Sequence, residues 1–439
     1  MKRVVEDIRY KNTPNYKITC YTEDNKLISK KSIYISMKQV NINGFVYILL
    51  FDNNHRLLEA PYRYLNIFKS KVSIGTRLNI AYTIKIFYEF LNIYEVDLNE
   101  IDYEDVILFY NFLAGISTSN EVLKIQKHLT THQIIINFNR LIAYIKFTHH
   151  KEVADVLTYS IAQLDTKNVR NLQNYNCPAF ISLNQMRTIH NYILSDTSID
   201  EITRMEYDCI YRIMFFAGLR RGEALGLTLE DFIPYKNTKG QTNYKVLIRN
   251  RVSDKRYQYA KRCMNVTDKS IYSTSDYQRE NVGYQTVYIS KSLYDGIEDY
   301  YVAKAMQFQK TGKTMPIADS VIGDKPNYYI FSNITKPTPL NRYSLEQYTR
   351  KMFVDLGIAV DTKVRTTNLL HRFRHGYAMY LLYVKRIPKS EAKHYMRQRS
   401  DDSLNVYDNP TQEMRQEMMS KLMEGIDEYI IENKTNQQE

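Results

Sequence analysis

Residues 369–382, LLHRFRHGYAMYLL, combine four basic side chains with a run of apolar ones. The basic residues His371, Arg372, Arg374 and His375 fall within five positions, directly before most of the apolar residues. The apolar residues predict a helix, and the basic residues then occupy its beginning. Positive charge concentrated in this way indicates an anionic partner.

Composition supports such a partner. The chain has 439 residues, a length that suggests roughly two or three domains, and 44% of its residues are hydrophobic. Its 60 Lys and Arg against 48 Asp and Glu leave a net charge of +12. This excess favours a polyanion such as nucleic acid over acidic protein surfaces or small acids.

Cysteine spacing and hydropathy exclude several classes of protein. Cys20, Cys177, Cys209 and Cys263 lie far apart and form no CxxC pair, so neither a zinc site nor a disulfide framework is indicated. The N-terminus MKRVVEDIRYKN lacks the apolar core of a signal peptide, and no run is long enough for a membrane helix. We therefore expect a reduced, cytoplasmic protein with no membrane contact.

Local patterns divide the chain into segments. Runs such as SIYISMKQV and GFVYILLF, within residues 15–58, predict a small β-rich unit. From about residue 73, apolar residues at three- and four-residue spacing predict an all-helical domain. The boundaries that we expect are a β-rich N-terminal extension at 1–65, a helical domain at 70–165, a linker at 166–182, a mainly helical domain with a small antiparallel sheet at 183–425, and a tail at 426–439.

Two strands and a second basic cluster stand out in the third segment. YKVLIRNRV alternates Tyr244, Val246 and Ile248 on one side, and GYQTVYIS has the same β-branched and aromatic character. Before them, GLRRGEAL at 218–225 places the adjacent arginines Arg220 and Arg221 after an apolar helix.

The ordered set of these motifs resembles the tyrosine recombinases, also called the phage integrase family. The set consists of GLRRGEAL, a β-hairpin with lysines, HRFRH at 371–375, and Tyr407 in SLNVYDN, 33 positions after Arg374. The resemblance covers roughly residues 183–425. Residues 73–165 resemble the family's core-binding domain in position and helix content only, and the first 65 residues match no module.

The resemblance implies a role for each motif residue. Arg220 and Arg374 would bind the scissile phosphate, for which forked guanidinium donors are better suited than lysines. His371 would act beside them as a general acid/base or phosphate donor. Tyr407 would attack phosphorus and form a covalent phosphotyrosine. This chemistry requires neither a metal nor a nucleotide cofactor.

Several neighbouring residues have simpler interpretations. If helical, Arg220 and Arg221 point about 100° apart, so only one can enter the site, and the resemblance selects Arg220. We expect His375 to be a core histidine that could also contact phosphate, and Arg372 to be a solvated or DNA-facing charge. Glu223, in the same motif as Arg220, is expected to be a structural partner.

Two positions depart from the family pattern, and one rival to Tyr407 exists. Gln398 stands nine residues before Tyr407, where relatives have histidine or tryptophan; it can donate a hydrogen bond but cannot shuttle protons. His394 is the alternative for that role. Tyr395 is the rival nucleophile, disfavoured by its shorter spacing from Arg374.

The lysine that would protonate the leaving oxygen is the other open position. Lys255, Lys261 and Lys269 all lie between the two predicted strands. We prefer Lys261, because it follows the first strand at the spacing seen in some relatives. The stretch 262–283 has the character of an insertion.

The resemblance implies a site-specific recombinase or integrase that exchanges DNA strands in a homo-tetramer on paired double-stranded DNA sites. A nucleoid-associated location, a mobile element and an accessory DNA-bending or directionality protein would fit this activity. Residues 1–65 could be an additional DNA-binding module or a packing extension. The alternatives are a type IB topoisomerase-like enzyme, which would relax supercoils without a partner site, and a non-catalytic DNA-binding regulator.

Overall fold

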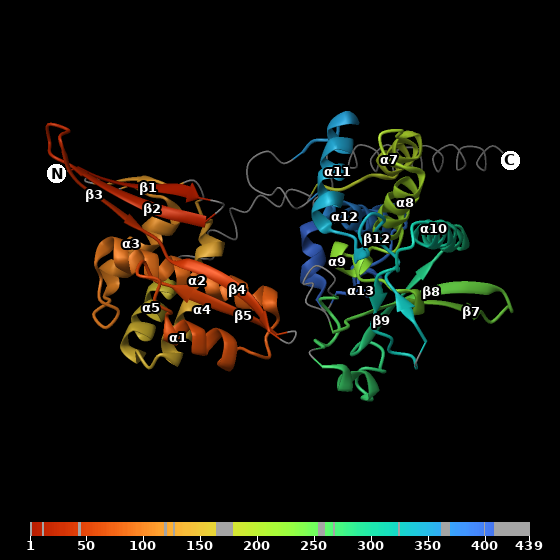
Figure 1. The fold of residues 1–439 in the computed structure, drawn as a ribbon, viewed down its shortest axis with the longest axis horizontal. Coiled ribbons are helices and arrows are strands. Elements are labelled where there is room, and N and C mark those ends of the chain that lie inside the picture. The colour runs from red at the N-terminus through yellow and green to blue at the C-terminus, as the bar shows by residue number, and fades with distance from the viewer. Residues whose placement is uncertain are drawn as a thin grey trace, which may run out of the picture. The chain divides into compact units, whose positions relative to one another are not determined.

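The computed structural model describes residues 2–10, 13–42, 45–117, 121–125, 128–163, 179–252, 260–266, 268–323, 325–360, 369–398 and 400–407. The chain divides into two compact units, Met1–Asn174 and Tyr175–Glu439 (Figure 1). Most of the expected linker and all of the expected tail at 426–439 lie outside the described residues.

The first unit begins with strands and continues with helices. Its elements are β1 (Lys2–Tyr10), β2 (Thr13–Tyr21), β3 (Leu27–Ile33), β4 (Ser36–Ile42), β5 (Phe45–Phe51), α1 (Glu59–Arg63), the π-helical turn η1 (Tyr64–Phe68), α2 (Ile74–Tyr94), α3 (Tyr103–Ala114), β6 (Glu121–Lys124), α4 (Thr131–Phe147) and α5 (Lys151–Gln163). The expected β-rich segment is present and starts earlier than the patterns suggested. Reciprocal side-chain caps mark two helix starts: Asp102 with Asp105 before α3, and Thr130 with Gln133 before α4.

The segment expected to be wholly helical also supplies one strand. Its β6 pairs in parallel with β1, so the first sheet has the order β3-β2-β1-β6, while β4 and β5 form a separate hairpin. Apolar periodicity did not reveal β6, because a four-residue strand is too short to display an alternating pattern. A core rich in phenylalanine joins the strands to the helices, with Phe87, Phe90, Phe109 and Phe112 at most 2% exposed.

The second unit is mainly helical around a small sheet. Its elements are α7 (Leu183–Ser195), α8 (Glu201–Phe216), α9 (Arg221–Leu225), η2 (Leu229–Asp231), β7 (Phe232–Lys236), β8 (Thr242–Arg249), η3 (Lys269–Ser273), β9 (Tyr284–Ile289), α10 (Lys291–Lys310), β10 (Ile317–Ala318), β11 (Asn327–Tyr328), β12 (Ser332–Asn333), β13 (Thr338–Pro339), α11 (Arg342–Asp355), α12 (His371–Met379), η4 (Tyr380–Val384), α13 (Lys389–Tyr395) and η5 (Asp401–Tyr407).

The two predicted strands of this unit are confirmed as β8 and β9. They pair antiparallel, with Tyr244 opposite Ile289 and Arg249 opposite Tyr284, and β7 adds a third strand on the other side of β8. The predictions missed β7, whose FIPYK sequence contains a proline; proline is tolerated at this edge position.

A buried core holds α8 against α12, the helix of the HRFRH motif. Gly376 makes this close packing possible, because a Cβ at that position would overlap the carbonyl oxygen of Ile181 and the ring of Phe215 on α8. A hydrogen bond from the Ile181 amide to the carbonyl of Arg372 fixes the chain before α7 on the same helix. The beginning of α12 is thereby held rigidly at the centre of the unit.

Candidate active site

The first basic motif forms a tight turn into a short helix. Gly218 has a φ of 58°, in the left-handed region, and a Cβ there would overlap the ring of Tyr377 on α12. Arg220 is the residue before α9, and the Glu223 carboxylate caps it by accepting from its backbone amide at 2.9 Å. The Arg220 side chain also donates to Glu223, at 2.6 Å. Within the GLRRGE sequence, Glu223 thus holds both the backbone amide and the side chain of Arg220, three positions before it.

The second basic motif brings Arg374 to this turn. Arg374 is 2% exposed, and its guanidinium donates to the carbonyl oxygens of Gly218 and Met396. It therefore connects α12 with the turn before α9 and with the end of α13. Burial lowers the pKa of Arg374, and repulsion from the nearby Arg220 lowers it further.

His371 lies on the same face of α12, at the edge of this cluster. Its ring contacts that of His375 edge-to-face, with the ring centroids 4.6 Å apart. Burial, followed by repulsion from Arg374 and Arg220, lowers the pKa of His371 to about 4. The imidazole is therefore neutral near neutral pH and has one donor and one acceptor available.

His375 binds the candidate nucleophile. The Tyr407 hydroxyl and Nδ1 of His375 are 2.5 Å apart, and Tyr407 itself is 3% exposed. Burial, followed by His371 and the nearby arginines, lowers the pKa of His375 to about 3, so the ring is neutral. With its proton on Nε2, the ring can accept a hydrogen bond from the Tyr407 hydroxyl at Nδ1. The expectation of a core histidine did not include this contact.

The backbone of Tyr407 is also held. Its carbonyl oxygen accepts a hydrogen bond from the hydroxyl of Tyr383, which belongs to the π-helical turn η4 that follows α12. Apolar side chains of α12 and α13 pack around it, including Met379, Ala392 and Met396. Helix α12 and its continuation thus hold Tyr407 at both the hydroxyl and the main chain.

Arg397 is a third arginine in the cluster, and the sequence reasoning missed it. Its guanidinium donates to the carbonyl oxygens of Ala217 and Gly218, both at 3.1 Å, and to Glu223 at 2.7 Å. The residue is 5% exposed. In the sequence, Arg397 is one of several basic residues in KHYMRQRS, a pattern typical of a solvated loop.

The backbone at Arg397 has the conformation of a glycine site. The amide of Arg397 bonds to His394 and that of Gln398 to Lys393, which is the Schellman pattern that ends a helix. Arg397 occupies the left-handed position of this motif with a φ of 50°. An arginine there costs roughly 1 kcal/mol relative to glycine.

Glu223 is the carboxylate that faces these guanidiniums. Burial opposes its ionisation, but Arg397, Arg220 and Arg374 together lower its pKa to about 2. Because the ionised carboxylate carries one negative charge among three guanidiniums, the cluster has a surplus of positive charge. Such a surplus, with donors fixed by packing, suits a phosphate group.

The structure also locates the residues weighed as alternatives. Arg221 forms an ion pair with Glu346 of α11, away from Glu223. The expectation that Arg372 is solvated is wrong: it is 4% exposed and donates to the carbonyl oxygen of Ala359, because its position on α12 faces the core. Tyr395 is 44% exposed, and its hydroxyl donates to Glu391 instead of a member of the cluster.

Gln398 and His394 take different environments around the end of α13. His394 is exposed. Gln398 is half-buried, and its Oε1 is buried without a hydrogen bond from any described residue. One acceptor of Gln398 is thus buried and unpaired among the described residues, whereas His394 faces solvent.

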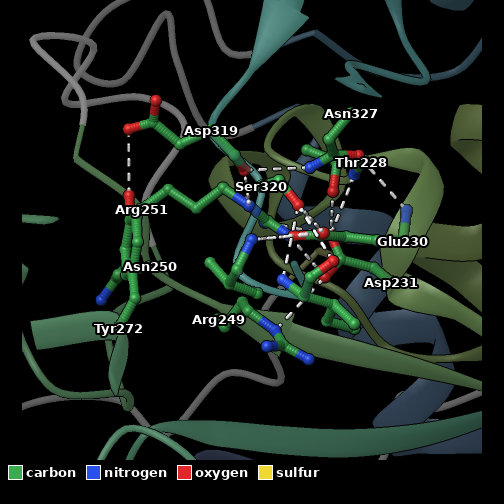
Figure 2. Close-up of polar contacts among 12 residues, drawn as sticks. Thr228, Glu230, Asp231, Arg249, Asn250, Arg251, Tyr272, Asp319, Ser320 and Asn327 are labelled. Atoms are coloured by element: carbon green, nitrogen blue, oxygen red, sulfur yellow. Dashed lines mark hydrogen bonds and ion pairs between the residues drawn. The ribbon is translucent and has the colours of Figure 1, made fainter. Parts of the chain in front are cut away.

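A buried polar network holds the end of β8, the strand that precedes the candidate lysines. Arg251 donates to both carboxylate oxygens of Asp231, at 3.1 and 2.9 Å, and to Glu230 at 2.8 Å (Figure 2). Thr228 closes the network by donating to Asp231 from its amide and its hydroxyl. The end of β8 is thereby fixed against the segment that follows α9.

Two of the three candidate lysines, Lys261 and Lys269, differ in their surroundings. Lys269 is held by Asp319 at 2.6 Å, and the main-chain carbonyl of Asp319 accepts from Arg251. Lys261 is exposed. Lys255 lies outside the described residues.

The chain is similar to known proteins in sequence and in fold. No family model matches the chain. Transposase A from transposon Tn554 of Staphylococcus aureus (strain Mu50 / ATCC 700699) is 24% identical over 277 residues, which cover 60% of this chain and 74% of the transposase. A post-cleavage complex of the site-specific recombinase XerH with a palindromic difH substrate aligns with 79% of this chain and 80% of its own, at 15% identity and a TM-score of 0.50. The chain has the tyrosine recombinase fold.

The tyrosine recombinase fold confirms the expected fold class, with mainly helical units and a small antiparallel sheet in the second one. The described part of the chain contains no helix that is long and apolar enough to cross a membrane. Within the same residues, no group of three or more His, Cys, Asp or Glu is arranged to hold a metal ion.

Proposed function

We propose that this chain is a site-specific DNA recombinase or integrase that cleaves and rejoins DNA through a covalent 3′-phosphotyrosine at Tyr407. The observation that carries the proposal is the position of the Tyr407 hydroxyl, which is bound by a neutral imidazole beside an arginine cluster. Two features of the relatives agree with it. The curated relative is a transposase, and the XerH complex is a recombinase bound to its DNA site.

The proposed reaction uses the cluster as a phosphate site. Arg220 and Arg374 bind the non-bridging oxygens of the scissile phosphate, and His371 donates a further hydrogen bond. As the Tyr407 oxygen bonds to phosphorus, its proton passes to Nδ1 of His375. The bound phosphate assists this transfer, because its negative charge offsets the repulsion from Arg374, which adds to burial in lowering the pKa of His375.

The leaving group completes the first step. The bond between phosphorus and the 5′ oxygen breaks, and we assign Lys261 to supply the proton that this oxygen needs. Rejoining is the reverse reaction, with a 5′ hydroxyl of another strand attacking the phosphotyrosine. Gln398 is assigned to a hydrogen bond with the phosphate, in place of a histidine.

We also propose the setting of the reaction. The chain acts on double-stranded recombination sites as a homo-tetramer that holds two sites together, with the helices of the first unit and the catalytic unit both contacting DNA. It serves the integration and excision of a mobile element in the cytoplasm, at the nucleoid, where an accessory DNA-bending or directionality protein assists. The net charge of +12 supports the DNA contact.

Covalent capture tests the proposal. Duplexes bound by the protein are selected from a random pool, nicked just downstream of the cleavage position so that the leaving strand diffuses away, and analysed on denaturing gels. The wild-type chain and Tyr395→Phe should form an adduct, while Tyr407→Phe should bind the same DNA and form none. Tyr395→Phe is the matched control, because it removes an exposed tyrosine hydroxyl from the same unit.

The same assay defines failure. An adduct formed by Tyr407→Phe but not by Tyr395→Phe would move the nucleophile to Tyr395. If both variants still form the adduct, or if the wild type binds DNA without forming any adduct, the proposed recombinase function is contradicted. Relaxation of a plasmid that lacks a selected site, by substoichiometric protein, would favour a topoisomerase-like enzyme instead.

A further inference from the structure

Arg397 combines a strained backbone with a buried side chain directed at the candidate phosphate site. The Schellman position that it occupies is ordinarily filled by glycine, because left-handed backbone is unfavourable for residues with a Cβ. The guanidinium nevertheless has three hydrogen bonds to the turn at 217–223. A strained residue whose side chain makes specific contacts at a functional site indicates a function for that side chain.

The oxygens of Glu223 are divided between two arginines. Oε1 accepts from Nη1 of Arg220 at 2.6 Å. Oε2 accepts from Nη2 of Arg397 at 2.7 Å and from the backbone amide of Arg220 at 2.9 Å. An arginine facing a carboxylate alone commonly binds both oxygens with two parallel hydrogen bonds. Arg397 prevents this arrangement for Arg220, because it occupies the second oxygen.

The consequence concerns the donors of Arg220 that remain. The Arg220 side chain is 20% exposed, and within the described part of the chain the hydrogen bond from its guanidinium is the one to Glu223. Its other donors can therefore face a ligand. Were Arg220 to bind Glu223 with both prongs of its fork, one of these donors would be withdrawn from the phosphate.

We infer that Arg397 is a positioning residue, which binds one oxygen of Glu223 and so keeps the guanidinium of Arg220 directed at the scissile phosphate. This inference rests on the proposed recombinase function. Arg397 and Arg374 both donate to the carbonyl oxygen of Gly218. Arg397 therefore contacts groups that hold both of the proposed phosphate-binding arginines. It contributes most among the three arginines to the low pKa of Glu223.

The principal test replaces Arg397 with glycine, the residue that its backbone favours. Single-turnover capture on the nicked duplex should slow by about 10-fold or more in Arg397→Gly, while DNA binding persists. Arg397→Lys, which keeps a cation near Glu223, should recover part of the loss. The matched control is Arg386→Gly, because Arg386 is an exposed arginine of the same unit with a φ of 54°, and its rate should equal that of the wild type.

A second substrate distinguishes positioning from general damage to the fold. A duplex with a neutral methylphosphonate at the scissile position lacks the negative charge that Arg220 would neutralise. On this duplex Arg397→Gly should lose less than about threefold relative to the wild type. A structural defect would slow capture equally on both substrates.

A third measurement addresses the route through Glu223. In a Glu223→Gln background the neutral amide no longer competes for Arg220, so adding Arg397→Gly should cost far less than it does alone. Equal losses on the two substrates, or full additivity with Glu223→Gln, would overturn the positioning role while leaving wild-type capture intact. Absence of capture by the wild type would instead overturn the proposed function, and the inference with it.

Discussion

The hydroxyl of Tyr407 lies 2.5 Å from Nδ1 of His375, although the two residues are separated by 32 positions in the chain. The contact joins α12 to η5, and the ring centroids are 5.5 Å apart. A neutral imidazole with its proton on Nε2 has a lone pair on Nδ1, which accepts the hydroxyl hydrogen and directs the oxygen lone pairs elsewhere. The same helix carries Arg374, so the proposed nucleophile and a proposed phosphate-binding arginine both contact one element.

We expect His375→Leu to slow covalent capture on the order of 10²-fold, because the variant loses both the orientation of Tyr407 and the proton acceptor. His375→Asn should retain more activity, since an asparagine side chain can still accept a hydrogen bond near the position of Nδ1. Single-turnover rates at saturating DNA measure both. His394→Leu is the control, because His394 is exposed, and an unchanged rate in His375→Leu would remove His375 from the reaction.

Acid should destabilise the second unit through its two site histidines. Their pKa values are lowered to about 4 for His371 and about 3 for His375 by burial and nearby positive charge, against about 6.5 in an unfolded chain. The unfolded state therefore binds more protons below pH 6.5, and stability falls as the pH drops from there toward 4. Above pH 7 these two histidines do not change the free energy of unfolding with pH.

Urea unfolding between pH 4 and pH 8 measures this effect. The fall in the free energy of unfolding between pH 6.5 and pH 4 should be smaller in His375→Asn than in the wild type, because one of the two half-buried histidines is gone. Identical slopes in the two proteins would show that His375 is not held neutral in the folded state.

The adjacent arginines should differ sharply in their effect on the reaction. Arg220→Ala should slow capture on the order of 10²-fold or more, as expected for loss of a preorganised donor, and so should Arg374→Ala. Arg221→Ala should lower stability through loss of its ion pair with Glu346 but leave the rate per folded molecule nearly unchanged. Capture rates normalised to the folded fraction test this, and a larger loss in Arg221→Ala than in Arg220→Ala would reverse the assignment.

The identity of the general acid can be tested with a leaving group that needs no proton. Lys261→Ala should cleave ordinary DNA slowly and recover on a duplex whose leaving 5′ oxygen is replaced by sulfur, because a thiolate departs unprotonated. Lys269→Ala should behave like the wild type on both duplexes, since its ammonium group is held by Asp319 at 2.6 Å. Rescue of Lys255→Ala in place of Lys261→Ala would transfer the role to Lys255.

Local sequence patterns determined much of the architecture and the list of motifs. The alternation in YKVLIRNRV predicted β8, and the helical periodicity after residue 73 predicted the helices of the first unit, because side-chain burial repeats with the backbone period. His371, Arg374 and His375 could be placed together from spacing alone, since residues three and four apart share a helix face. The short strands β6 and β7 left no comparable signal.

Tertiary structure decided which charges converge. Nothing in MRQRS distinguishes Arg397 from a solvated arginine; its role depends on the end of α13, where a left-handed residue turns its side chain toward Glu223. Likewise Arg372 and Arg374 are near neighbours in one motif, yet one bonds to Ala359 and the other to Gly218, because each faces a different neighbour of α12. Periodicity reports which face of an element is buried, whereas the partner on that face is set by packing between segments distant in the chain.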